Sequence, residues 1–453
     1  SSSSSSSHKD ELLNGIDSSS VPRVKWSFGD DVGKAMDASQ GSPVVFENAP
    51  SNAWNAMNWT LSRMRRRFTR DLRLPVKILR NQEKFHLGCC VPERLKARTF
   101  AKRLGDYANQ GKVGYFAGPL QFLGKSLQDD VDVSMYDARE VSPQSEYCQY
   151  VAETQCLQTT VWIGSRFATT PCHHDELHNF FVQIQGRKRF TLFPPDAWNE
   201  LQLYPKYHQY HRNVRADIES NTPRRPGRVD VELNPGDVLY LPPLWFHQVQ
   251  ALTDTSISAN VWSASRWIRD VMTIWNEDVP SDLKTNDDND VTNLIRRLAS
   301  YVKNIVIAVL GNSEFLETVW RTRYDTTSSR EMNEKSAEYI QHQEYIKRVD
   351  KDSPSFLTQH GISNPESALN IACSSSSAIR PESRYETNAN RIATIFREAT
   401  RESEDRGRVR WVRGAIEIYL AHYLEDLISQ VVGFQHVNYF FRQCLLDNSK
   451  SEL

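Results

Sequence analysis

The spacing of hydrophobic and polar positions changes along the chain. Between about residues 146 and 265, short apolar runs alternate with turn-forming residues such as Pro171, Gly186 and Pro235-Gly236. Closely spaced runs rich in β-branched and aromatic residues are typical of a sandwich or barrel of short antiparallel strands. We expect strands at residues 159–163, 179–184, 189–193, 237–241, 247–252 and 257–262.

From residue 266 onward the apolar positions take a helical spacing. The longest candidate helices run over residues 291–310 and 411–432, and Gly311 and Gly433 follow them, as expected just after a helix C-terminus. In the second helix an apolar stripe recurs at steps of three and four residues: Ile416, Leu420, Leu424, Leu427 and Val431. This stripe predicts either a face packed in the protein core or a homodimer interface.

The chain before residue 146 is less regular. Residues 1 to about 20 are polar and rich in serine, so we expect a disordered tail. The following stretch mixes two kinds of element. Residues 43–46 and 75–79 are strand-like, and residues 51–73 and 92–110 are helix-like.

These patterns predict a mostly β fold, a jelly roll of the double-stranded β-helix (cupin) type with helical additions. The expected organisation is a tail at 1–20, an α/β lead-in at 21–145, the jelly-roll core at 146–265 and an all-α C-terminal region at 266–453. A chain of 453 residues is long enough for more than one structured unit.

Composition narrows the classes of function. The formal net charge of -1 excludes a globally basic protein that coats nucleic acid. No apolar run approaches the roughly 18 residues of a membrane span, so we expect no membrane partner. The seven cysteines form no C-x-x-C pair, which argues against a disulfide scaffold or a zinc ribbon. We therefore expect a reducing compartment, the cytoplasm or the nucleus.

The segment around His173 carries the most informative chemistry. Residues i and i+2 of a strand share a face, so His173 and Asp175 are able to bind one cation. A second histidine, His247, stands at the start of a later β run. Two histidines and one carboxylate make the facial triad typical of non-haem iron(II), which leaves three coordination positions open.

A lysine follows this segment at a position expected to be buried. If Gly186-Arg187 closes a two-residue hairpin, Lys188 falls on the same face as Asn179, Phe181 and Gln183. A buried lysine needs an anionic partner, because an unpaired buried charge costs several kcal/mol. The carboxylate of a diacid would supply one.

The whole pattern resembles the JmjC/cupin-type Fe(II)- and 2-oxoglutarate-dependent oxygenases, and most of all the subgroup of the hypoxia-inducible-factor asparaginyl hydroxylase. The first matching blocks are Thr170-Pro171-x-His173-x-Asp175, Asn179-Phe180-Phe181 and Gly186-x-Lys188-Arg189. Further matches are Leu192-Phe193-Pro194-Pro195, Pro235-Gly236-Asp237, Trp245-x-His247 and Asn260-x-Trp262. Coverage is strong for residues 146–265 and weak for 40–145.

The resemblance implies a role for each matching residue. His173, Asp175 and His247 are the expected ligands of Fe(II). Lys188 and Thr170 are expected to hold the distal carboxylate of 2-oxoglutarate, with Asn179 and Asn260 as co-substrate or supporting contacts. Tyr150 is similar to a tyrosine that some relatives direct at the same carboxylate, and its alternative is a plain core aromatic.

The implied reaction is the hydroxylation of a side chain or nucleoside, or a demethylation through hydroxylation, with O2 as oxidant and decarboxylation of 2-oxoglutarate to succinate. We expect a protein or peptide substrate. An RNA hydroxylase, acting on a tRNA nucleoside, is the alternative, because the arginines between Arg63 and Arg73, joined by Arg224, Arg225 and Arg228, could bind phosphates. Those arginines could equally be a solvated surface paired with acidic residues. A non-catalytic scaffold of the same fold is the third hypothesis.

Overall fold

The computed structural model describes most of the chain. The described residues are 20–29, 31–80, 91–138, 157–219, 227–275, 283, 291–325, 354–359, 361–374, 379–405 and 411–446. The serine-rich tail and Tyr150 lie outside them. The chain divides into two compact units, the first formed by residues 1–197, 218–268 and 406–411 and the second by 198–217, 269–405 and 412–453.

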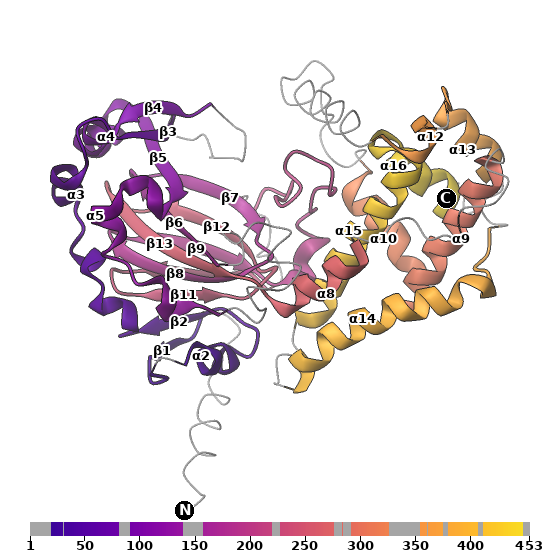
Figure 1. Ribbon diagram of the computed structural model, residues 1–453, viewed down its shortest axis with the longest axis horizontal. Coiled ribbons are helices and arrows are strands. Elements are labelled where there is room, and N and C mark those ends of the chain that lie inside the picture. Colours follow the sequence, from indigo (N-terminus) through magenta and orange to yellow (C-terminus); the bar gives the residue numbers. More distant parts are fainter. Residues whose placement is uncertain are drawn as a thin grey trace, which may run out of the picture. The chain divides into compact units, whose positions relative to one another are not determined.

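Two β-sheets form the first unit (Figure 1). The larger sheet has nine strands in the order β1-β2-β11-β8-β13-β6-β5-β3-β4. Their bounds are β1 Arg23–Lys25, β2 Val44–Glu47, β3 Arg73–Arg80, β4 Glu93–Lys96, β5 Lys112–Pro119, β6 Leu157–Gly164, β8 His178–Gln185, β11 Val238–Leu241 and β13 Ser256–Ser263. The smaller sheet has the order β10-β9-β12-β7. Its bounds are β7 Thr169–His174, β9 Lys188–Phe193, β10 Val229–Leu233 and β12 Phe246–Ala251.

From β6 to β13 the chain passes repeatedly between the two sheets, which is the course of a jelly roll. Phe181 and Leu239 of the larger sheet pack with Phe190 and Leu192 of the smaller one in a shared apolar cluster. The predicted mostly β jelly-roll class is therefore confirmed, and the six strands expected between residues 159 and 262 are present.

The lead-in differs in detail from the sequence pattern. Its strands β1 to β5 extend the larger sheet at both edges, and β5 at Lys112–Pro119 was not expected. The helix expected at 92–110 begins as strand β4 and becomes helix α4 only at Ala97–Arg103. Pairing of β4 with β3 explains the difference, because a partner strand distant in sequence overrides local helical spacing.

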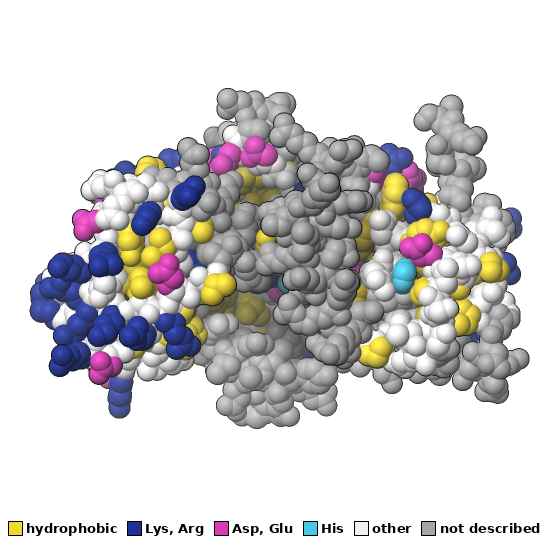
Figure 2. Space-filling model, turned by 90° about the horizontal axis from the view of Figure 1, so that it is seen from above, with side chains coloured by type: hydrophobic (Ala, Val, Ile, Leu, Met, Phe, Trp, Pro, Cys, Tyr) yellow, Lys and Arg dark blue, Asp and Glu magenta, His cyan; other side chains and the backbone are white. Residues whose placement is uncertain are grey.

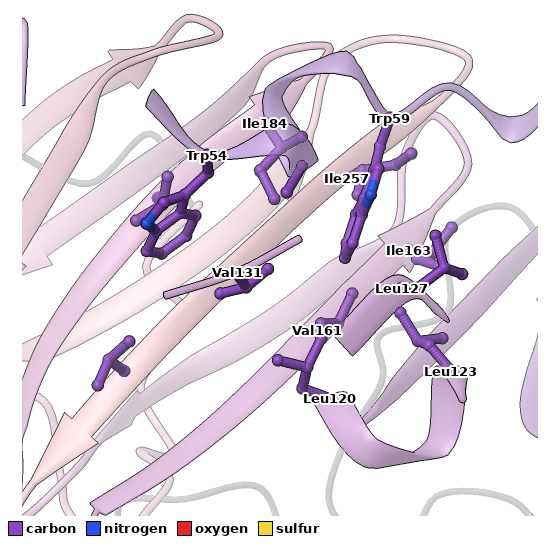
Figure 3. Close-up of a cluster of buried hydrophobic side chains, with 14 of the residues drawn as sticks. Trp54, Trp59, Leu120, Leu123, Leu127, Val131, Val161, Ile163, Ile184 and Ile257 are labelled. Atoms are coloured by element: carbon purple, nitrogen blue, oxygen red, sulfur yellow. The ribbon is translucent and has the colours of Figure 1, made fainter. Parts of the chain in front are cut away.

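Lead-in helices cover the outer face of the larger sheet. The helices are α2 Val32–Ser39, η1 Pro50–Ala53, η2 Asn55–Asn58, α3 Leu61–Arg67, η3 Leu104–Asp106, η4 Ala108–Gln110, η5 Leu120–Leu123, α5 Lys125–Gln128 and η6 Val133–Tyr136. Figure 3 shows Trp54, Trp59 and Leu127 against Val161 and Ile257 of the sheet. This packing occupies one face of the strands, and the alternate side chains face the interior of the barrel.

The connection from β8 to β9 differs from the predicted hairpin. Strand β8 pairs with β11 and β13, whereas β9 pairs with β10 and β12 in the other sheet. The hairpin expectation is therefore wrong, since Gly186 and Arg187 carry the chain from one sheet to the other. Gly186 has a φ of 70°, and a Cβ there would lie 2.1 Å from the Thr255 carbonyl oxygen.

Replacement of Gly186 by alanine should therefore destabilise the first unit. We expect a loss of roughly 1–3 kcal/mol in the free energy of unfolding, because alanine is strained at positive φ and its methyl group meets rigid backbone. Urea denaturation followed by tryptophan fluorescence measures the change. Gly105→Ala is the matched control, since nothing lies within 4 Å of a Cβ at that position. Equal effects of the two substitutions would contradict the argument.

The second unit is helical, and its two longest predicted helices are present as α9 Val291–Leu310 and α15 Val412–Val432. The remaining helices are α8 Arg266–Trp275, which begins in the first unit, α10 Glu314–Arg323, α12 Phe356–Gln359, α13 Pro365–Cys373, η10 Ser383–Tyr385, α14 Glu386–Asp405, η12 Phe434–His436, α16 Val437–Phe440 and η13 Phe441–Leu445. The stripe residues Leu420, Leu424, Leu427 and Val431 are buried, which favours core packing over a dimer interface. No described helix is both long and apolar enough for a membrane crossing.

One disulfide departs from the expectation drawn from cysteine spacing. Cys373 at the end of α13 is bonded to Cys444 in η13, and both side chains are buried. The two residues are 71 positions apart, so only the folding of the second unit brings them together. Spacing along the sequence carries no signal for such a pair.

Candidate metal centre

Neighbouring strands of the smaller sheet bring the two histidines together. His173 of β7 lies directly opposite His247 of β12, and their ring centroids are 4.3 Å apart. Asp175 follows β7, and its backbone carbonyl accepts a hydrogen bond of 2.7 Å from the Leu244 amide. Its carboxylate oxygen Oδ2 lies 3.7 Å from Nε2 of His247. Within the described residues, this is the one group of three potential ligands whose donor atoms all lie within 4.8 Å of one another.

The hydrogen bonds of the two histidines fix how they present their rings. Nδ1 of His173 is 2.8 Å from the Pro171 carbonyl oxygen, and Nδ1 of His247 is 3.0 Å from the Trp245 carbonyl oxygen. A carbonyl only accepts, so each Nδ1 carries the proton and each Nε2 carries the lone pair. This is the arrangement that metal-binding histidines show, because the second nitrogen then orients the ring.

The triangle of donor atoms suits a divalent transition-metal ion. The sides of the triangle are no longer than 4.8 Å, so an ion at its centre lies at most about 2.8 Å from each donor atom. Movements of the side chains by less than ~1 Å then give normal metal–ligand bonds of about 2.0–2.2 Å. Two imidazoles and one carboxylate on one side of an ion form the set used by non-haem iron(II). The residues therefore fit the metal that the sequence pattern implies.

A β-bulge explains how Thr170 shares the inner surface with His173. Residues three apart on a regular strand point to opposite faces. Here Thr170 is opposite Val249 while His173 is opposite His247, so β7 contains one residue more than β12 over this stretch. The extra residue restores the same orientation for both side chains. The hydroxyl group of Thr170 lies 3.4 Å from the Tyr115 phenol oxygen.

Lys188 lies inside the barrel, as predicted from the sequence. Its place there is due to strand β9 of the smaller sheet and not to the expected hairpin. Its side chain is 2% exposed, and its ammonium group donates a 2.7 Å hydrogen bond to the Ser258 hydroxyl and lies 5.0 Å from the centroid of the Phe181 ring. No described acidic residue forms an ion pair with it. Burial lowers the pKa of Lys188 to about 7. An incoming carboxylate would supply the missing countercharge.

A chain of side-chain hydrogen bonds joins three strands of the larger sheet, from Trp162 of β6 through Asn260 of β13 to Asn179 of β8. The indole N–H of Trp162 donates to Oδ1 of Asn260 at 2.8 Å, and the Asn260 amide donates to Oδ1 of Asn179 at 3.2 Å. Both asparagines are buried. The two asparagines named from the sequence are therefore brought together, and their partner Trp162 holds their amide groups in one orientation.

Tyr115 is a site residue that the sequence analysis missed. It belongs to β5, contacts Thr170 and stacks on Trp162 with ring centroids 5.9 Å apart. Burial raises the pKa of the Tyr115 phenol well above its usual value, so the group remains a neutral hydrogen-bond donor at neutral pH. The short apolar run from Val113 to Ala117, which contains a β-branched residue and two aromatic ones, is a strand signal that could have drawn attention to it. Tyr150, expected near this position, lies outside the described residues.

The two other nearby histidines lie elsewhere. His174 is buried, and its ring centroid lies 5.4 Å from that of Phe246 rather than in the triad. His178 is the first residue of β8, and its Nδ1 is 3.0 Å from the Tyr240 hydroxyl. Because His178 and Asn179 are adjacent in a strand, they point to opposite faces of the sheet. Strand β8 therefore directs His178 to the face of the sheet opposite Asn179.

Comparison with known proteins agrees with this geometry. A family model described as "Cupin-like domain" matches residues 35–266. The chain is 31% identical over 258 residues to "HSPB1-associated protein 1 homolog" of Danio rerio, covering 49% of this chain and 51% of that protein. It is 25% identical over 233 residues to "Lysine-specific demethylase JMJ30" of Arabidopsis thaliana, covering 49% of this chain and 50% of that protein.

A further match is shorter, and it is to a protein named for tRNA modification. The chain is 33% identical over 90 residues to "tRNA wybutosine-synthesizing protein 4" of Gibberella zeae, covering 20% of this chain and 9% of that protein. The chain spans about half the length of the Danio rerio and Arabidopsis thaliana relatives. The family model covers about half of the chain and includes both histidines and the aspartate of the triad. The chain therefore belongs to the cupin-like JmjC domain family.

Proposed function

We propose that this chain is an Fe(II)- and 2-oxoglutarate-dependent dioxygenase that hydroxylates a protein side chain, or demethylates it through hydroxylation. The observation that carries the proposal is the convergence of His173, Asp175 and His247 in one group of donor atoms. Three protein ligands leave three coordination positions of an iron(II) ion for the co-substrate and O2. Bound iron with 2-oxoglutarate supplies the oxidising chemistry that protein side chains lack.

The residues of the barrel interior perform the binding and positioning. His173, Asp175 and His247 would hold the metal, and the ammonium group of Lys188 would pair with the distal carboxylate of 2-oxoglutarate. The hydroxyl groups of Thr170 and Tyr115, which lie 3.4 Å from each other, would donate to the same carboxylate. A charge-assisted hydrogen bond of this kind contributes roughly 1.5–3 kcal/mol.

The asparagine pair and the barrel walls complete the site. Asn179 and Asn260 would orient the co-substrate through their amides, which Trp162 fixes by its hydrogen bond to Asn260. Phe181 lies below the ammonium group of Lys188 and is buried. Such apolar walls exclude water, which strengthens the ionic contact to a bound carboxylate.

A protein substrate is favoured by the names of the longer matches. One relative is named for lysine demethylation and another for its association with HSPB1. Both matches cover about half of this chain, whereas the tRNA-modifying relative matches a fifth of it. We therefore propose a protein or peptide as the primary substrate, and a gain of one oxygen or a loss of one methyl group as its change.

Succinate release tests the proposed class of reaction. The purified chain should convert 2-oxoglutarate to succinate when Fe(II) and O2 are both present, and removal of either should reduce release to background. Zn(II) in place of Fe(II) is the control, because it fits the same ligands and has no redox chemistry. Succinate formed equally with Zn(II), or none formed with Fe(II) and a broad peptide library, would contradict the proposal and favour the scaffold hypothesis.

A further inference from the structure

Positive charge is concentrated in two segments of the first unit. Residues 61–80 and 91–112 contain fourteen lysines and arginines, whereas their only acidic residues are Asp71, Glu93 and Asp106. The whole chain has a formal net charge of -1. The excess is therefore local, and it does not follow from a generally basic composition.

The fold joins the two segments into one surface. Helix α3 packs against helix α4, and strand β3 pairs with β4 at the edge of the larger sheet. Figure 2 shows the resulting group of Lys and Arg side chains in dark blue at the left of the view. We define the basic surface by six exposed residues of these elements and their connections: Arg65, Arg66, Arg70, Arg73, Arg94 and Lys96.

Acidic partners do not account for these residues. Arg67 is the exception in this region, because it pairs with Asp130 and so belongs to the framework. Within the described chain, Arg65, Arg70 and Lys96 form no ion pair and no side-chain hydrogen bond. The expected alternative of a surface paired with acidic residues thus holds for Arg67 alone in α3.

The second arginine group named from the sequence does not extend this surface. Arg228 pairs with Asp230 and donates to the Ile218 carbonyl oxygen. Arg224 and Arg225 lie outside the described residues. The basic surface is instead extended by Arg94 and Lys96 of β4, which the sequence analysis did not single out.

The register of β3 and β4 carries a second indication of an anionic ligand. Arg73 lies directly opposite Lys96 in this antiparallel pair. Like charges directly opposite each other destabilise a sheet, and an anion bound between them removes the repulsion. Lysines on edge strands also discourage sheet extension. Protection of the sheet edge explains Lys96, but it does not explain the arginines of α3.

We propose that the basic surface binds the phosphate backbone of double-helical RNA. Arginine forks match phosphate oxygens in two parallel hydrogen bonds, which favours phosphates over a diffuse acidic protein surface. The two segments expose no aromatic side chain among the described residues, so stacking on unpaired bases is not provided. This inference does not rest on the proposed oxygenase activity.

The shape of the charged elements favours RNA over DNA. Helices α3 and α4 have seven residues each, and the charges are spread over helix and strand. Proteins that read B-form DNA commonly insert a helix or a two-stranded ribbon into its major groove. Double-stranded RNA is instead recognised mainly through phosphates and 2′-hydroxyls across a wide, shallow minor groove.

Binding to a blunt RNA duplex of about two helical turns tests the proposal. Fluorescence anisotropy with the full chain should show an affinity that falls steeply with salt. Arg65→Glu with Arg70→Glu should weaken binding at least tenfold and lower the slope of log K against log salt by between about one and two. Lys25→Glu with Lys34→Glu makes the same charge change on exposed residues of the lead-in and should leave the affinity within about twofold.

Three further comparisons decide between partners. A DNA duplex of the same length should bind several times more weakly, and polyglutamate at equal charge should fail to displace the RNA. His247→Ala should retain full RNA affinity, so loss of the oxygenase reaction is separable from loss of this surface. Salt-independent binding, equal effects of the two double variants, equal binding of DNA, or displacement by polyglutamate would each overturn the proposal.

Discussion

Asp175→Ala is expected to abolish succinate release by the proposed oxygenase while the fold persists. The carboxylate is the only anionic member of the triad, and Oδ2 lies 3.7 Å from Nε2 of His247. Changes to residues that merely support metal ligands already cost 10–100-fold in affinity or activity, so loss of a ligand should cost more than about 100-fold. His247→Ala should give the same result.

A metal-binding measurement separates this role from a structural one. Calorimetric titration with Mn(II) or Co(II) should show one site in the native chain and a strongly weakened site in Asp175→Ala. The free energy of unfolding without metal should change by less than about 1 kcal/mol, because Asp175 is a partly exposed residue after the end of β7.

Asp254→Ala serves as the matched control. Its side chain is 65% exposed and pairs with Arg166 on the surface. This variant should keep both metal binding and succinate release. If Asp175→Ala released succinate at the native rate, the triad would not be the catalytic metal site, whatever its geometry.

The parts of the site that were predictable from the sequence are those set by local strand geometry and short motifs. His173 and Asp175 are two residues apart, and the period of a strand places them on one side. Strands such as β9 and β11 were evident because their apolar runs are bounded by glycine and proline. The long helices α9 and α15 were evident from their spacing and from the glycines that follow them.

The remainder depends on pairings that no local pattern encodes. Tyr115 reaches Thr170 only because β5 joins the larger sheet beside β6. Thr170 faces inward only because of a bulge, and a spacing of three from His173 by itself predicts the opposite face. Lys188 was placed inside by a hairpin that does not form. The chain crosses to the facing sheet instead, where the inward side of β9 still looks into the same interior.

Lys188→Met is expected to weaken 2-oxoglutarate binding and, at the same time, to stabilise the protein without ligand. The ammonium group is buried beside Ser258 and Phe181, and burial lowers the pKa of Lys188 from 10.5 to about 7. Loss of a charge-assisted hydrogen bond should weaken 2-oxoglutarate roughly 10–150-fold, with metal binding unchanged. An apolar side chain of similar length avoids the cost of the buried charge, which is of the order of a few kcal/mol.

The pH dependence of stability has a definite sign. In the unfolded chain the lysine stays protonated up to about pH 10.5, whereas in the folded protein it loses its proton around pH 7. The destabilisation caused by Lys188 is therefore full below pH 7 and is relieved as the pH rises from 7 to about 10.5. The stabilisation in Lys188→Met should accordingly be largest at pH 6 and smaller at pH 9, as measured by urea denaturation.

The titration of Lys188 should also make the affinity for 2-oxoglutarate depend on pH. A bound carboxylate raises the pKa of Lys188, so 2-oxoglutarate binding takes up a proton above pH 7 and its affinity should fall by one to two orders of magnitude between about pH 7 and pH 9. In Lys188→Met this fall should disappear. Lys303→Met is the control, because Lys303 is also buried but donates to the Ile379 carbonyl oxygen in the second unit. Removal of Lys303 should reduce stability and leave 2-oxoglutarate affinity unchanged. A native affinity that is constant from pH 7 to 9 would show that Lys188 is not the group that binds the carboxylate.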